Sequence, residues 1–562
     1  MVSFFLKVLL GHKRQLILIT ALQLPLALAT IWTAFLIKAI IDSITQSGSA
    51  YANAQTNVII FISLILLQSC VQLFSTRLGI NLKTKVSNTL QLRLMEHIQA
   101  LEFKNIQSEH GGKFLTLITS DVDNVAGTIA DQVPRLLKSV VICVGATIAV
   151  SLIYPPFLLA FAIFVPFIFI YNKFFGRKMK ALHIEMQEKE TLFRNLTQDI
   201  LGNVAVIKAF GNANKWIAEM AGRQQVRTRA SIKKAMLSNT VTTALSFGGY
   251  VAFILILFVG AGMVRDKAIT FGALISFIQL VSYSTNSIRG IATSSGSFAS
   301  CLGSASRIMG VLDLSKEPVG EMPEVPTDSG VGVRFLDVTF KYENNPHHLP
   351  TQNVLENLSF EILPRQMIGI VGASGVGKST LANLIMSFYK PQSGVVLLKT
   401  EEGMEFEVSS KTRNVISYVP QGNTVISGTI RDNILMGAQS ASDEEVKVAL
   451  ELAGLCEILD WPEGLETQIG EKGTRLSAGQ AQRVCLARAF VRTSRLLILD
   501  EATSNLDIAT EMQIIKSLHE RMTNRTIIII THRLEALEYC DKVFRLDNFG
   551  KSFFELSSRG LQ

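Results

Sequence analysis

Two long stretches without a charged residue limit what this chain can fold into more than any other feature. No Asp, Glu, Lys or Arg occurs between Asp42 and Arg77, and residues 139–172 are free of charge for 34 positions. A helix needs about 20 apolar residues to cross a bilayer. The first stretch therefore contains one crossing. The second, interrupted at Tyr154-Pro155-Pro156, is long enough for two slightly oblique crossings with a tight turn between them.

The same criterion, applied along the first half, predicts a membrane-spanning helical bundle over residues 15–310, preceded by an interfacial elbow helix at residues 1–14. The segments that follow the second and fourth crossings are too long for loops. We expect the helices to continue through them, and roughly 25 helical residues would reach nearly 40 Å into the cytoplasm. The six predicted crossings lie at about residues 15–37, 58–78, 136–153, 157–172, 240–264 and 268–288.

Charge patterning favours a membrane protein over a nucleic-acid-binding protein. The net charge is +8, yet only 18% of the residues are charged and 48% are apolar. Residues 173–234 carry thirteen Lys and Arg against five Asp and Glu, between two apolar stretches. Positive charge concentrates in cytoplasmic segments of membrane proteins. We therefore expect an integral, multi-pass protein with both termini in the cytoplasm, contacts with membrane lipids and no nucleic-acid partner.

After a predicted linker at residues 311–330, charge density becomes that of a soluble domain, and residues 331–562 are predicted to form an α/β domain around GASGVGKST. Met367–Val371 (MIGIV) precedes this loop as a predicted buried strand, and a helical pattern follows it. A chance match to G-x-x-x-x-G-K-[ST] rarely has that context. Backbone N–H groups of such a loop surround phosphate. The predicted nucleotide contacts here are Gly372, Ala373, Ser374, Gly375, Val376, Gly377, Lys378, Ser379 and Thr380.

Polar residues follow three further predicted strands. Gln421 comes after NVISYVP, Asp500 and Glu501 end RLLILDE, and His532 follows TIIIIT. Open α/β sheets bind ligands at the carboxyl ends of their strands, and unpaired buried acids are costly. We expect Ser379, Gln421 and Asp500 to hold Mg²⁺. Glu501 would polarise the attacking water, and His532 and Gln421 would assist it.

Two other segments complete the predicted nucleotide site. Tyr342, thirty residues before the loop, could be a core aromatic, but it could also stack on a base. Leu476-Ser477-Ala478-Gly479-Gln480 is typical of a helix start that presents N–H groups, with no phosphate left to bind in its own chain. Such a helix start would fit the nucleotide of another subunit. We therefore predict a dimer in which Ser477, Gly479 and Gln480 contact the partner's nucleotide.

These motifs together resemble the ABC transporter superfamily, and specifically an exporter-type half-transporter, over essentially the whole chain. The Walker A motif is GASGVGKST, the Q-loop Gln421, the signature LSAGQ, the Walker B motif LLILDE, the D-loop Ser504-Asn505-Leu506-Asp507 and the H-loop His532. Tyr342 is similar to the A-loop aromatic. The resemblance implies ATP and Mg²⁺ as cofactors and a homodimer with two composite ATP sites.

Other segments carry the resemblance less strictly. Residues 467–473 are similar to the exporter X-loop, residues 111–125 to the first cytoplasmic segment, and residues 207–216 to the entry of the second coupling helix. Three features depart from the family pattern: Ala478 replaces a Gly of the signature, Asn505 stands where Ala is common, and the usual Asp-Gly turn between Gly394 and Gln421 is missing. Because Glu501, His532, Ser477 and Gly479 are all present, neither composite site looks degenerate.

The function that follows from the resemblance is an ATP-driven exporter. It would move a lipid-linked molecule, a drug-like amphiphile or a peptide by alternating access, and an apolar cavity would suit such substrates. The predicted crossings hold almost no ionisable residues. Arg289 in the last helix is the main exception, and it could be functional, lie at the inner end of the sixth crossing or face water. An ATP-gated channel or sensor on the same scaffold is the alternative. Six crossings disfavour a soluble ABC ATPase that acts on nucleic acid. The expected location is the bacterial inner membrane, with the ATPase domain in the cytoplasm.

Overall fold

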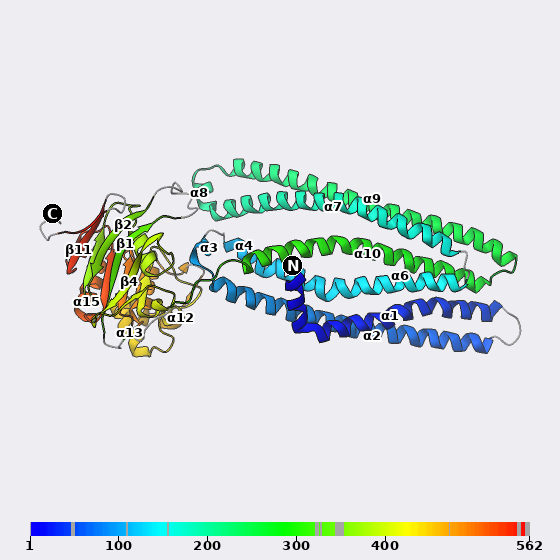
Figure 1. Ribbon diagram of the computed structural model, residues 1–562, viewed down its shortest axis with the longest axis horizontal. Helices are drawn as coiled ribbons and strands as arrows, with labels where there is room; N and C mark the ends of the chain where they lie inside the picture. Colours follow the sequence, from blue (N-terminus) through cyan, green and yellow to red (C-terminus); the bar gives the residue numbers. More distant parts are fainter. Residues whose placement is uncertain are drawn as a thin grey trace. The chain divides into compact units, whose positions relative to one another are not determined.

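The protein consists of two compact units, and the computed structural model describes residues 2–45, 51–107, 111–153, 157–320, 325, 329–342, 353–470, 473–547 and 552–556. The first unit, Met1–Gln99 with Gly111–Leu314, is helical. The second, Ala100–His110 with Ser315–Gln562, contains the sheets (Figure 1). The predicted architecture, a helical bundle followed by an α/β domain, is confirmed. The predicted turn at 154–156, and residues 321–324 and 326–328 of the predicted linker, lie outside the described residues.

Long helices dominate the first unit, where they lie side by side (Figure 1). The longest, α9, has 53 residues, which correspond to roughly 80 Å of helix, against about 30 Å of bilayer hydrocarbon. Two π-helical turns, Leu117–Asp121 and Thr128–Gln132, flank α5. The helices are α1 (Val2–Thr45), α2 (Tyr51–Gln99), α4 (Gly111–Thr116), α5 (Val122–Gly127), α6 (Val133–Ile153), α7 (Phe157–Gly202), α8 (Val204–Ala209), α9 (Ala213–Arg265) and α10 (Phe271–Leu312).

Four helical stretches among the described residues are long and apolar enough to cross a membrane. They are Gly11–Thr45, Ala52–Gln99, Gly112–Leu152 and Ala213–Arg265. The crossings predicted at 157–172 and 268–288 fall in α7 and α10, which are not among these four, so they stay predictions. Helix α1 has one non-helical residue, His12 (φ −124°, ψ 16°), near the end of the predicted elbow helix.

Small residues allow α1, α6 and α10 to pack closely. A Cβ on Gly145 of α6 would lie 2.4 Å from Cδ1 of Ile31 of α1. A buried apolar cluster, which includes Ala34, Ala146 and Phe277, surrounds this contact. Close approach of helix backbones through small residues is the usual means of association in lipid, where apolar burial alone gives little.

The second unit contains two large sheets. One is antiparallel with strand order β2-β1-β4-β5, and the other has order β12-β11-β3-β10-β9-β6. The strands are β1 (Val331–Phe340), β2 (Leu355–Ile362), β3 (Met367–Val371), β4 (Ser393–Thr400), β5 (Glu405–Glu407), β6 (Ile416–Val419), β7 (Gly428–Thr429), β8 (Gln468–Ile469), β9 (Leu496–Asp500), β10 (Thr526–Ile530), β11 (Lys542–Asp547) and β12 (Ser552–Leu556). The helices are α3 (Phe103–Gln107), α11 (Lys378–Ile385), α12 (Ile430–Leu435), α13 (Asp443–Leu452), α14 (Ala478–Phe490) and α15 (Ile508–Arg521).

The parallel part of the second sheet positions the candidate site. Strands β3, β10, β9 and β6 are neighbours and run parallel. Every residue of β3, β9 and β10 is buried, which explains their continuous apolar sequences. The loops after these four strands therefore emerge at one edge of the sheet, where open α/β sheets bind ligands.

A short segment from the first half of the chain belongs to the second unit. The Phe103 ring of α3 stacks on Phe388 with centroids 4.6 Å apart, and it meets the edge of Tyr389 at 5.9 Å. The Glu317 N–H donates to the Ala100 carbonyl at 2.8 Å. The described residues 100–107, between α2 and α4 in sequence, thus belong to the second unit.

Candidate nucleotide site

The loop between β3 and α11 has the backbone that a phosphate cradle requires. Gly375 and Gly377 have φ of 80° and 112°, values that a residue with a Cβ rarely adopts. Lys378, which is 5% exposed, donates from Nζ to the carbonyls of Gly372 and Ala373 at 2.9 and 3.0 Å. Burial lowers the pKa of this ammonium. The predicted phosphate contacts are therefore gathered in one loop, with the lysine folded against it.

Two of the three predicted Mg²⁺ ligands are in contact. The Ser379 Oγ donates to Asp500 Oδ1 at 3.0 Å, and the Tyr418 hydroxyl lies 3.4 Å from Asp500 Oδ2. Asp500 is 1% exposed, and burial raises its pKa. Among the described residues no Lys, Arg or His forms an ion pair with it. A buried carboxylate with only hydroxyl partners suits a hard divalent cation, which prefers oxygen ligands.

The third predicted ligand, Gln421, contacts Glu501 instead. Its Nε2 donates to Glu501 Oε2 at 2.5 Å, and His532 Nε2 lies 2.8 Å from Glu501 Oε1. Glu501 has a φ of 48°, which is uncommon outside glycine and is often found at functional sites. The three residues predicted to be catalytic, which follow three different strands, thus meet at one carboxylate.

Tyr342 lies against α11, the helix that follows the phosphate loop. Its hydroxyl is 3.1 Å from Thr380 Oγ1, and its ring meets those of Phe340 and Tyr389 edge to face, at 4.8 and 5.1 Å. Burial raises the pKa of Tyr389 to about 12. Sequence reasoning singled out Tyr342 but missed Tyr389 and Tyr418, because neither has a motif of its own.

The segment Leu476–Gln480 forms the start of α14. Ser477 is the N-cap, and its Oγ accepts from the Gln480 N–H at 3.1 Å while Gln480 Oε1 accepts from the Ser477 N–H at 3.0 Å. Ser477 and Ala478 are exposed. Within the described part of the chain, no hydrogen bond or ion pair joins this helix start to the loop 372–380.

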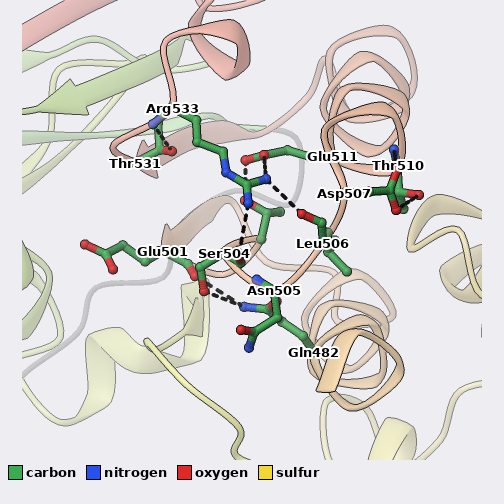
Figure 2. A network of polar contacts seen from close by, with 11 residues as sticks. Gln482, Glu501, Ser504, Asn505, Leu506, Asp507, Thr510, Glu511, Thr531 and Arg533 are labelled. Atoms are coloured by element: carbon green, nitrogen blue, oxygen red, sulfur yellow. Dashed lines mark hydrogen bonds and ion pairs between the residues drawn. The ribbon is translucent and has the colours of Figure 1, made fainter. Parts of the chain in front are cut away.

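The turn after Glu501 is held by several side chains (Figure 2). Gln482 of α14 accepts from the Asn505 N–H at 2.9 Å and donates to the Glu501 carbonyl at 3.3 Å. Arg533 donates to the carbonyls of Ser504 and Leu506 at 3.0 and 2.9 Å. Sequence reasoning named residues 504–507 but missed Gln482 and Arg533.

Two family models match the chain in the order of its two units. The model of the ABC transporter transmembrane region matches residues 16–288, and the ABC transporter model matches residues 355–504. Between them they cover most of the chain.

Relatives and a solved structure agree with these matches. A Rickettsia bellii protein with the provisional name export ATP-binding/permease protein is 28% identical, covering 95% of this chain and 92% of its own. An ATP-dependent lipid A-core flippase of Syntrophus aciditrophicus is 27% identical over 91% of this chain and 84% of its own. A bacterial Atm1-family ABC exporter, solved with ATP bound, aligns with a TM-score of 0.79 at 23% identity, covering 96% and 94% of the two chains.

The two family matches, the near full-length relatives and the shared fold lead to one assignment. The chain belongs to the ABC transporter superfamily as an exporter-type member, in which a transmembrane region is fused to an ATP-hydrolysing domain.

Proposed function

We propose that two copies of this chain form an exporter with two composite ATP sites. Each site would combine the loop 372–380 of one copy with residues 476–480 of the other. The observation that carries this proposal is the start of α14: its N-cap Ser477 is exposed, and among the described residues no hydrogen bond or ion pair joins it to the phosphate loop of its own chain. A capped helix start that faces outward is suited to a phosphate supplied by another subunit.

Within each site, Glu501 accepts the hydrogen bond of the attacking water and polarises it. Its position between Gln421 and His532, at 2.5 and 2.8 Å, supports this role. The Lys378 ammonium leaves the carbonyls of its own loop and donates to the β- and γ-phosphates. His532, 44% exposed on its side chain, contacts the γ-phosphate and orients it for in-line attack.

Mg²⁺ fits the residues beside this carboxylate. The hydroxyl of Ser379 and the carboxylate of Asp500 lie 3.0 Å apart, and Gln421 follows the neighbouring strand. These three would hold the ion, which when bound neutralises charge on the phosphates during transfer. Tyr342 would stack on the base of ATP, a role supported by the neighbouring ring of Tyr389 at 5.1 Å.

The proposed transport cycle couples ATP binding to alternating access. ATP draws the two ATPase units together, the membrane helices change from an inward-facing to an outward-facing state, and hydrolysis resets them. A hydrophobic or amphipathic substrate follows from the scarcity of ionisable residues in the predicted crossings. The lipid A-core flippase among the relatives favours a lipid-linked molecule, with drug-like amphiphiles and peptides as the other candidates.

The proposed location is the bacterial inner membrane, with both termini and the ATPase unit in the cytoplasm. The excess of Lys and Arg in residues 173–234 supports this orientation. The bacterial origin of the relatives supports a bacterial membrane as the location.

The proposal is tested by ATP turnover of the purified protein in lipid nanodiscs. Glu501→Gln should bind ATP with an affinity within about twofold of the wild type, yet lose more than about a hundredfold in turnover, because the amide cannot polarise water. Glu520→Gln, on the exposed side of α15, is the matched control and should turn over normally. Wild-type turnover by Glu501→Gln would refute the assigned chemistry.

The same preparation identifies the substrate class. Lipids with large head groups, hydrophobic cations and amphipathic peptides are added one class at a time. Stimulation of turnover by one class, absent in Glu501→Gln, is the expected result. ATP-dependent ion conductance without stimulated turnover would instead favour a gated channel.

A further inference from the structure

The loops after β9 and β10 are joined at two places rather than one. The first is the contact between His532 and Glu501, at 2.8 Å. The second lies one residue along the chain, where Arg533 reaches the turn that follows Glu501 (Figure 2). Consecutive Cα atoms are 3.8 Å apart. The backbone of His532 therefore cannot shift far while the Arg533 side chain stays bound.

Arg533 binds this turn through three acceptors. Its Nη1 donates to the Leu506 carbonyl at 2.9 Å and to the Glu511 carboxylate, and its Nη2 donates to the Ser504 carbonyl at 3.0 Å. Glu511, in the first turn of α15, is 2% exposed. A charged, hydrogen-bonded pair of this kind is costly to break from one side, because the remaining carboxylate stays buried without an opposite charge beside it.

The turn that Arg533 binds is itself fixed from its other face. The Thr503 Oγ1 donates to Glu511 Oε1 at 2.6 Å, and the Asn505 N–H donates to Gln482 at 2.9 Å. Because Gln482 also donates to the Glu501 carbonyl, the backbone that carries Glu501 and the turn 503–506 form one connected set of hydrogen bonds. Arg533 is the member of that set that lies on the loop of His532.

The arrangement requires an arginine. A guanidinium has five N–H donors in a planar fork and can serve two carbonyls and a carboxylate together. A lysine ammonium in the same place keeps the charge opposite Glu511, but it cannot reproduce the fork. A residue needed for charge alone would tolerate Arg533→Lys.

We propose that Arg533 is a positioning residue for ATP hydrolysis, which fixes the His532 loop to the turn 503–506 and so holds the imidazole at Glu501. The inference rests on the proposed roles of Glu501 and His532. Arg533 touches neither nucleotide nor water in this account. It acts through its neighbour.

The test compares three variants of the full-length protein in nanodiscs. Arg533→Ala should lower kcat by about tenfold to a hundredfold, because small misplacements of a catalytic group have effects of that size. Arg533→Lys should lower kcat by roughly three- to tenfold, because the ammonium keeps the charge opposite Glu511 but loses part of the hydrogen bonding to the turn 503–506. In both, the KM for ATP and the affinity for a fluorescent ATP analogue should stay within about twofold of the wild type, which separates positioning from binding.

Glu511→Gln separates positioning from simple stability. It removes the charge of the pair but leaves the two carbonyl contacts of Arg533, so it should lower Tm while reducing kcat by less than about threefold. Arg521→Ala is the matched control, because Arg521 is exposed at the end of α15 and makes a single ion pair with Glu451 at 3.4 Å.

Three results would overturn the inference. Wild-type kcat in Arg533→Lys would show that charge alone suffices, and an equal loss of kcat in Glu511→Gln and Arg533→Ala would show a structural role. A parallel loss of analogue affinity would assign Arg533 to binding. Measuring Glu501→Gln alongside distinguishes failure of the proposed function from failure of this inference. If Glu501→Gln is inactive while Arg533→Ala is normal, only the positioning role of Arg533 fails.

Discussion

Two segments of the ATPase unit face phosphate in the proposed site. They differ in whether the phosphate that each would contact is bound by the same chain or by a partner. The loop 372–380 lies between a buried strand and its helix, and its lysine already has partners in the loop. The helix start 476–480 satisfies the N–H groups of Ser477 and Gln480 through a reciprocal cap, and it presents Ser477 to solvent.

The comparison indicates which half of the site a single subunit can assemble. The residues for binding nucleotide are gathered by adjacent strands of one sheet, so a monomer should bind ATP. In the proposed dimer, the second helix start would contribute only when another subunit arrives. Binding and turnover should therefore respond differently to changes in the two segments.

The largest effect on nucleotide binding and turnover is expected in the loop 372–380. Lys378→Ala removes a charge-assisted donor to phosphate, which is worth about 2–4 kcal/mol, or roughly thirty- to a thousandfold. Both binding of a fluorescent ATP analogue and turnover should fall. Lys447→Ala, on the exposed side of α13, should change neither. Retention of tight binding would mean that the loop does not hold the phosphates.

A smaller and more selective effect is expected at the outward-facing helix start. Asp and Asn both cap helices well, so Ser477→Asp and Ser477→Asn should keep similar Tm values. Only Asp places a negative charge where the partner's phosphate would lie. We expect about a tenfold or greater loss of turnover for Asp relative to Asn, with analogue binding within about twofold. Equal turnover in the two variants would contradict the placement of Ser477 at the partner's phosphate.

The smallest effect is expected at the base. Tyr342→Ala should raise the KM for ATP by about three- to tenfold, because an aromatic contact is worth roughly 0.5–1.5 kcal/mol, with kcat unchanged. Tyr342→Phe should be within about twofold of the wild type, because the ring rather than the hydroxyl would stack. If Phe behaves like Ala, the hydroxyl contact with Thr380, at 3.1 Å, matters more than the ring.

The strand ends could be predicted from the sequence because their signals are local. An apolar run that ends in Asp500 and Glu501, or in His532, indicates both a buried strand and the edge at which it stops. The parallel order β3-β10-β9-β6 then brings those ends together. The overall class was predictable for the same reason, since the charge-free stretches and the phosphate loop are each contained in a few tens of residues.

Contacts between segments that are distant in the sequence could not be predicted from local patterns. Tyr418 beside Asp500, Tyr389 beside Tyr342 and Arg533 on the turn after Glu501 are ordinary residues in ordinary positions of the sequence. Each acquires its partner through packing between segments distant in the chain. The same holds for Phe103, which lies in the first half of the chain but stacks within the ATPase unit.

The placement of residues 100–107 in the ATPase unit has a consequence for how the protein is made. Phe103 leaves the ribosome roughly 285 residues before Phe388, which at about 5–20 residues per second corresponds to some 15–60 s without its partner. During that interval the later membrane helices are still being translated. The surface around Phe388 is therefore completed by Phe103, which is synthesised before the helices that follow α3. A C-terminal fragment made without this segment would leave the Phe388 ring without that stacking partner.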